Sequence, residues 1–156
     1  MMKKAVLAAA LVVFAVPRFS HAQTRLFEGT WQADVAKSSY VPGARPKRET
    51  LSFEAVGDRF KVSLDGENGQ GPYHSEATGK FDGAEVPVFA TPARNAKFSY
   101  VFNRIDDHTW DIVITVNGAR QLVTHNVVSD DGKTMRSTSR VTSNGVVNQD
   151  VIYEKQ

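Results

Sequence analysis

The chain has 156 residues, 41% hydrophobic and 23% charged, with no cysteine and a formal net charge of +2. The first 22 residues hold three of the 19 basic side chains and no acidic one, so residues 23–156 carry 16 basic and 17 acidic side chains. This balance lacks the basic surplus that drives nucleic-acid binding. The absence of cysteine excludes disulfides, thiol catalysis and cysteine zinc sites.

Residues 1–22 have the three-part pattern of a secretory signal peptide. Two lysines precede the apolar run 5–16, Pro17 ends that run, and Ser20-His21-Ala22 places small residues at positions −3 and −1 before Gln23. Twelve apolar residues reach about 18 Å as a helix, which is short of the ~30 Å hydrocarbon core of a bilayer. We therefore expect a cleaved signal, a periplasmic or secreted protein, and no membrane span in the mature chain.

Residues 23–156 are predicted to form a single all-β domain. Apolar residues recur there with a period of two, and turn residues appear about every ten positions, which is typical of a barrel or a sandwich. Residues 40–47 and 66–72 read as loops, whereas Asp82-Gly83, Asn117-Gly118 and Asn144-Gly145 read as tight hairpin turns. Ten strands are expected, at residues 27–33, 48–56, 59–64, 73–81, 85–89, 97–105, 109–116, 119–129, 133–142 and 146–154.

Short connections between consecutive strands favour an antiparallel up-and-down β-barrel of about 8–10 strands. Closing the sheet on itself leaves no strand edge exposed. A two-sheet sandwich is the alternative architecture. Pro87, which has no amide hydrogen to donate, marks the fifth predicted strand as an edge strand or a short irregular piece.

Gly29-Thr30-Trp31 on the first predicted strand, followed by such a meander, resembles the lipocalin and fatty-acid-binding protein group. The resemblance implies a lipocalin-like (calycin-type) barrel whose closed end is plugged by Gly29 and Trp31. It also implies a basic residue from a late strand packed across the indole, and Arg140, or else Arg136, is expected there. Residues 40–47 (YVPGARPK) are too rich in Pro and Gly for the helical lid of fatty-acid-binding proteins.

A closer resemblance is to small exported bacterial proteins called lipocalin-like, and it extends over nearly the whole mature chain. The segments that carry it are GTWQADVAKSSYVPG, Arg104-Ile105-Asp106, residues 129–134 (SDDGKT) and Tyr153-Glu154-Lys155.

Two neighbouring predicted strands carry apolar stripes that are too extensive for an exposed surface. These stripes are interpreted either as a simple packed core or as the wall of a pocket for a hydrophobic or amphipathic small molecule. Polar side chains at positions 73, 100 and 125 would orient such a ligand. The residues assigned to the pocket are Tyr73, Phe98, Tyr100, Phe102, Trp110 and His125.

No catalytic residue, metal ligand or cofactor can be assigned from the sequence. It contains no Gly-x-Ser-x-Gly elbow, His-Glu-x-x-His helix or phosphate loop. His74 and Glu76 share one strand face, but no third metal ligand accompanies them. An enzyme that uses His74 or His125 is a further hypothesis without a motif to support it.

We therefore expect an exported barrel module that binds an apolar or amphipathic small molecule, with no nucleic-acid partner. The alternative is a non-enzymatic structural or interaction protein of the cell envelope whose barrel is filled by side chains. Arg45, Lys47 and Arg48 lie in and next to the first long loop. They are interpreted either as part of a solvated loop or as a basic group of side chains that attracts an anionic head group.

Overall fold

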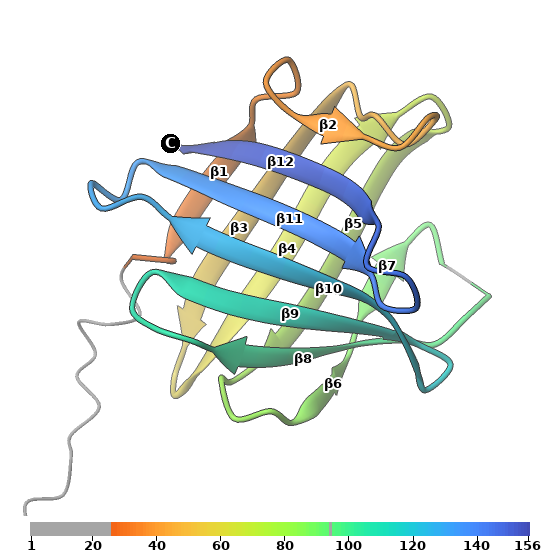
Figure 1. Cartoon of the computed structure of the whole chain (residues 1–156). Coiled ribbons are helices and arrows are strands. Elements are labelled where there is room, and N and C mark those ends of the chain that lie inside the picture. Colours follow the sequence, from red (N-terminus) through yellow and green to blue (C-terminus); the bar gives the residue numbers. More distant parts are fainter. Residues whose placement is uncertain (1–25, 94) are drawn as a thin grey trace, which may run out of the picture.

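The computed structural model describes residues 26–93 and 95–156, which form one sheet of 12 strands (Figure 1). The predicted signal peptide lies outside these residues. Within the described ranges there is no helix, so none that is long and apolar enough to cross a membrane. The strands are β1 (Gly29–Ala33), β2 (Ser39–Tyr40), β3 (Arg48–Val56), β4 (Arg59–Asn68), β5 (Gly71–Gly79), β6 (Glu85–Pro87), β7 (Phe89–Thr91), β8 (Phe98–Arg104), β9 (Thr109–Val116), β10 (Ala119–Val128), β11 (Thr134–Val141) and β12 (Val147–Lys155).

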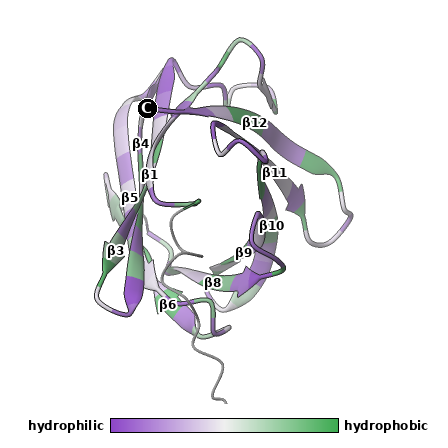
Figure 2. Ribbon diagram, turned by 90° about the vertical axis from the view of Figure 1, so that its left-hand side faces the viewer, coloured by the Kyte–Doolittle hydropathy of each residue, from purple (hydrophilic) through white to green (hydrophobic). Residues whose placement is uncertain are grey.

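The strands form an antiparallel ring in the order β6-β8-β9-β10-β11-β12-β1-β3-β4-β5-β7. The first strand, β1, pairs with both β12 and β3 and so joins the two ends of the chain. In Figure 2, which looks along the barrel, the strands surround a central space. The prediction of an antiparallel up-and-down barrel is confirmed, and the sandwich alternative is wrong.

One short segment bridges the remaining opening of the ring, between β5 and β8. β6 pairs with β8 and β7 pairs with β5. Between them, the Val88 amide donates a hydrogen bond to the Phe98 carbonyl oxygen at 3.0 Å. The predicted hairpin at Asp82-Gly83 is therefore only partly correct, because residues 85–87 pair with β8 and the segment returns along β5 only at Phe89–Thr91. Pro87 does lie at an end of the strand order, as predicted.

The predicted loop at residues 66–72 is also wrong over most of its length. β4 continues to Asn68 and β5 begins at Gly71, so the turn is much shorter. Gly66 pairs with Tyr73 across the two strands, and a Cβ at position 66 would overlap the Tyr73 ring. Gly66 therefore makes room for an aromatic ring rather than for a turn. The predicted turn at Asn117-Gly118 is confirmed, with positive φ at both residues.

The half of the barrel around Trp31 is filled with aromatic side chains. Trp31, Phe102 and Trp110 are 0% exposed. The chain just before β1 turns into the middle of the ring (Figure 2), which brings the Phe27 ring to 4.0 Å from that of Trp110. The other rings of this cluster are Phe53, Phe60 and Phe81. This half, called the closed half below, is a packed core.

An ion pair on the outer face of the barrel predicts part of the pH dependence of stability. Arg136 Nε and Nη2 donate to the Asp150 carboxylate at 2.9 and 2.5 Å, and Thr138 Oγ1 donates to it at 2.9 Å. The Arg136 guanidinium and the Thr138 hydroxyl hold the pKa of Asp150 below its usual value. The ionised carboxylate therefore stabilises the fold above about pH 4, and this contribution is lost as pH falls through the folded-state pKa.

We expect Asp150→Asn to lower the free energy of unfolding near neutral pH and to have a smaller effect below about pH 4. Urea denaturation of both proteins between pH 2.5 and pH 7 measures the difference. A difference that stays constant over this range would show that the ion pair does not contribute to the pH dependence.

Candidate functional site

The half of the barrel away from Trp31, called the open half, contains an inner cavity of about 140 Å³. This is close to the size of an engineered protein cavity that binds benzene, about 150 Å³. One wall is mostly apolar and comes from β3, β4, β8 and β9; the other wall, which begins at β10 beside β9, is mostly polar and comes from β10 and β11. The apolar wall consists of Leu51, Val62, Leu64, Tyr100, Ile112 and Ile114, and the polar wall of Thr124, Asn126, Ser137 and Ser139.

The polar wall is buried and internally hydrogen bonded. All four of its residues are at most 9% exposed. The Thr124 and Ser139 hydroxyls lie 2.7 Å apart, and Ser137 Oγ donates to Asn126 Oδ1 at 2.7 Å. Because a hydroxyl oxygen has two lone pairs, these groups retain acceptor capacity that faces the cavity. A bound molecule with a donor group can therefore be hydrogen bonded from this wall.

A second cavity of about 510 Å³, the mouth cavity, lies at the open end of the barrel. Gln149 on β12 lines both cavities. The lining of the mouth cavity is more polar than that of the inner one, and includes Glu49, Asn68, Gln70, Tyr73, Thr91 and Gln149. The interior thus becomes more polar from the packed core to the mouth.

A buried carboxylate, Glu49, faces the interior at this open end. It is 6% exposed, and on β3 it follows the same alternation as the buried Leu51. Tyr73 Oη donates to Glu49 Oε2 at 2.7 Å, and Tyr153 Oη donates to Glu49 Oε1 at 2.5 Å. These two bonds offset part of the cost of removing a carboxylate from water. Across the described ranges, no cation forms an ion pair with Glu49.

The tyrosines around Glu49 are held in their protonated form. Burial, and then the hydrogen bond to the Glu49 carboxylate, raise the pKa of Tyr73. Burial and the negative charge of Glu49 also raise the pKa values of Tyr153 and Tyr40. The Tyr73 and Tyr153 phenols therefore act as hydrogen-bond donors to a negative group.

The structure places three of the six predicted pocket residues near the open half. Tyr100 lines the inner cavity, and Tyr73 lines the mouth cavity. Phe98 lies toward the same end of the barrel, where it lines a groove beside β6 rather than either cavity.

The other three predicted pocket residues lie elsewhere. Phe102 and Trp110 are fully buried in the closed half, where they contact Phe60 and Phe27 respectively. His125 is on the outer face of β10, where its Nδ1 lies 2.7 Å from Asp111 Oδ1. His125 alternates with inward-facing neighbours, so the pleat of the strand directs it to solvent.

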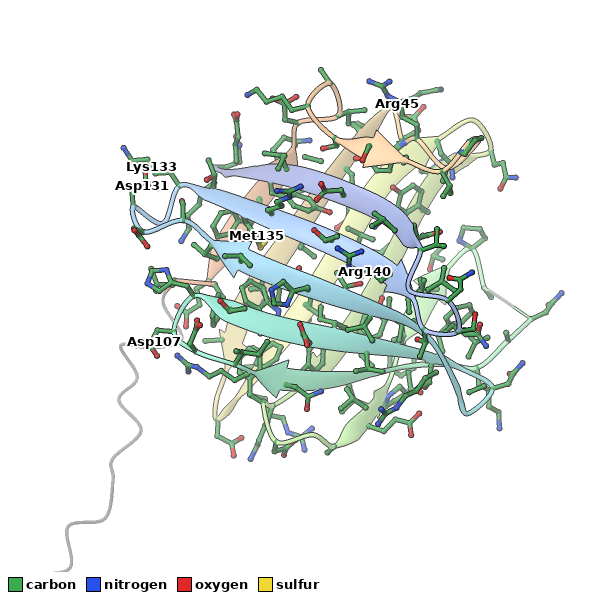
Figure 3. All side chains as sticks on the ribbon, in the orientation of Figure 1. Arg45, Asp107, Asp131, Lys133, Met135 and Arg140 are labelled. Atoms are coloured by element: carbon green, nitrogen blue, oxygen red, sulfur yellow. The ribbon has the colours of Figure 1, made fainter. Side chains whose placement is uncertain are left out.

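The cation that packs on Trp31 is Lys155 rather than Arg140. Lys155 Nζ lies 5.1 Å from the centroid of the Trp31 ring, and Trp31 Nε1 donates to the Phe27 carbonyl oxygen at 3.1 Å. Gly29 lies directly beside the Lys155 side chain. Arg140 is exposed on β11, the strand that also carries the buried Met135 (Figure 3). The expected arrangement at the closed end therefore exists with a different basic residue.

Other predicted polar groups are already paired, and one of them, His74, also lines the mouth cavity. His74 Nδ1 lies 2.7 Å from Asp65 Oδ1, and no group of three His, Asp or Glu residues that could hold a metal occurs in the described ranges. Lys47 and Arg48 are both paired with Glu67. The basic residues next to the first long loop are thus partly neutralised.

Sequence analysis missed Glu49, Tyr153 and the polar wall. The sequence pattern that could have indicated them is a polar residue two positions away from a buried apolar residue on the same strand. Glu49 is related in this way to Leu51 on β3, and Ser137 to Met135 on β11. Alternation assigns such residues to the inward face, and a polar residue on that face indicates either a network or a site.

No protein-family model matches the sequence, and no curated protein matches it either. Among solved structures, a Schistosoma mansoni fatty acid binding protein in complex with arachidonic acid aligns with a TM-score of 0.61 at 19% identity, covering 86% of this chain and 98% of that one. A point mutant of the fluorescent protein UnaG aligns with a TM-score of 0.62 at 16% identity, covering 85% and 98%. The redesigned β-barrel mFAP1, bound to DFHBI, aligns with a TM-score of 0.50 at 12% identity, covering 87% and 100%.

These alignments extend over almost the full length of each compared chain. At such low identities they establish the fold, and they agree with the strand order described above. The chain therefore has the lipocalin-like, calycin-type barrel fold that Gly29-Thr30-Trp31 predicts.

Proposed function

We propose that this chain is an exported binding protein whose barrel interior holds a small amphipathic molecule. The observation that carries this proposal is the inner cavity with one apolar and one polar wall. The lipocalin-like fold supports it, because barrels of this size can hold one small ligand. The apolar part of the ligand would lie against β3, β4, β8 and β9, and its polar part toward β10, β11 and the mouth.

The polar wall supports a ligand site better than a solid core. Burying hydroxyl and amide groups contributes less to stability than burying apolar groups of similar size, even when they are hydrogen bonded. Thr124, Ser137 and Ser139 lie at inward positions that Val or Ala would fill without loss of packing. Polar groups that converge on an apolar pocket are the usual arrangement of a small-molecule site.

A non-enzymatic interaction protein is the second candidate function. Two observations favour it: the closed half is completely filled, and the inner cavity of about 140 Å³ is smaller than the ~300 Å³ at which ligand pockets usually begin. In that case the outer strands, and not the interior, would bind a partner.

Native mass spectrometry of the protein, purified gently from the cells that produce it, distinguishes these functions. We expect a reproducible extra mass that disappears on denaturation and that identifies the ligand class. A clean apo mass, with no thermal shift across a panel of small apolar and amphipathic compounds, would contradict the binding function and favour the interaction protein.

A substitution that fills the cavity tests the location of the site. Ser75 on β5 lines the inner cavity, so Ser75→Leu is expected to occupy the free space, to keep the fold, and to abolish the extra mass. Thr78→Leu introduces the same residue on the same strand, facing outward, and is expected to leave the extra mass unchanged. Equal loss in both variants would place the bound molecule outside the barrel.

A further inference from the structure

We infer that Glu49 selects a cationic head group, so that the ligand is a small amine with a short aromatic or alkyl part. This inference rests on the proposed function and specifies its ligand. A protonated primary or secondary amine would lie in the mouth cavity and donate to the Glu49 carboxylate. Its apolar part would extend past Gln149 into the inner cavity.

The charge of the interior supports an amine over a carboxylic acid. Glu49 is the one acidic or basic residue with less than 9% exposure in the described ranges, and it lines the mouth cavity. No described Lys or Arg lines either cavity. An anionic head group would thus meet a negative charge at low dielectric, where repulsion is stronger than in water.

The Lys and Arg side chains that pack against interior rings are located in the closed half. Lys155 lies over Trp31, and the Arg104 guanidinium lies 5.9 Å from the Phe27 ring centroid. Neither of these cations lines the inner cavity or the mouth cavity. Arg45, whose charge acts on Tyr40, donates to the Val35 carbonyl oxygen and forms no ion pair with Glu49.

The hydrogen bonds of Glu49 leave it able to accept more. An ionised carboxylate has about four lone-pair sites, and Tyr73 and Tyr153 use one on each oxygen. Both phenols are donors, so they orient the carboxylate. A ligand ammonium can then donate to the free lone pairs without displacing either tyrosine.

The dimensions of the two cavities limit the size of the amine. The inner cavity of about 140 Å³ accommodates a group about the size of benzene. Tyr153 lines this cavity and also hydrogen bonds Glu49. A linker of about two carbon atoms between ring and amine is therefore expected to suit the site better than a long chain.

Isothermal titration calorimetry of the protein with three matched probes tests this inference: 2-phenylethylamine, the neutral 2-phenylethanol, and the anionic 3-phenylpropionate. We expect the amine to bind at least tenfold more tightly than the alcohol, and the acid to bind least. In Glu49→Gln the amine is expected to lose at least tenfold in affinity and the alcohol much less. Glu67→Gln removes the same charge at the same end of the barrel from a side chain paired with Lys47, and is expected to change amine affinity less than twofold.

The outcomes separate the inference from the proposed function. Binding of the alcohol or the acid to the unsubstituted protein as tightly as the amine would overturn the amine preference and leave the binding function intact. Equal loss of amine affinity in Glu49→Gln and Glu67→Gln would overturn the role of Glu49. Failure of all three probes would overturn the inference, and combined with a clean apo mass it would overturn the binding function too. The three-probe comparison needs no variant, so it decides the preference even if Glu49→Gln does not fold.

Discussion

Replacing Trp31 with alanine is expected to lower the free energy of unfolding by about 3–5 kcal/mol, the usual cost of deleting a buried tryptophan. The indole is 0% exposed, donates a hydrogen bond to the Phe27 carbonyl oxygen, and lies under Lys155. Its removal leaves a cavity and an unpaired carbonyl where the chain before β1 enters the core. Urea denaturation followed by circular dichroism measures the loss.

Phe89→Ala is the matched control for this prediction. Phe89 is also a large aromatic residue on a strand, but it is 67% exposed. Its replacement is expected to change the free energy of unfolding by no more than about 0.5 kcal/mol. Similar losses in the two variants would show that Trp31 does not plug a packed end of the barrel.

Gly79→Ala is expected to destabilise the barrel by about 1–3 kcal/mol through overpacking. Gly79 ends β5 beside the opening between β5 and β8. A Cβ at this position would lie 2.8 Å from Cδ2 and Cε2 of Phe102, a ring that is 0% exposed. The backbone of Gly79 does not have a positive φ, so the cost arises from contact with the ring and not from backbone strain.

The expected loss of stability in Gly79→Ala is opposite in sign to the usual effect of replacing glycine with alanine. Where glycine can be replaced without strain, alanine usually stabilises a protein by about 0.4–1 kcal/mol. Gly69→Ala is such a control, since no atom lies within 4 Å of its Cβ position. In a double-mutant cycle, Phe102→Leu is expected to reduce the cost of Gly79→Ala. Additive effects would show that the two residues do not contact each other.

Strand alternation and turn residues predicted most of the barrel correctly. The hairpin at Asn117-Gly118 was predicted because both residues tolerate positive φ, and the structure has it there. Local patterns failed where the pairing partner is set by closure of the whole sheet. Residues 85–89 are predicted as one strand, but in the closed ring residues 85–87 pair with β8 and Phe89–Thr91 pair with β5.

The candidate site was less predictable from sequence than the fold. Aromatic residues signal burial, but not whether the buried position is packed or lines a cavity. Tyr100 and Phe102 are two positions apart on the same face of β8, yet only Tyr100 reaches the inner cavity. Glu49 was overlooked because an acidic residue near the start of a strand resembles ordinary solvated surface. Its burial depends on tyrosines 24 and 104 positions away.

A methyl-resolved NMR titration with 2-phenylethylamine tests most directly whether the barrel interior is a binding site. We expect chemical-shift changes for methyl groups that line the inner cavity, those of Leu51, Leu64 and Ile114. The exposed methyl groups of Val56 and Val146 are predicted to keep their shifts. Changes confined to exposed methyl groups, or no change at any concentration together with a clean apo mass, would show that the barrel interior is not a binding site.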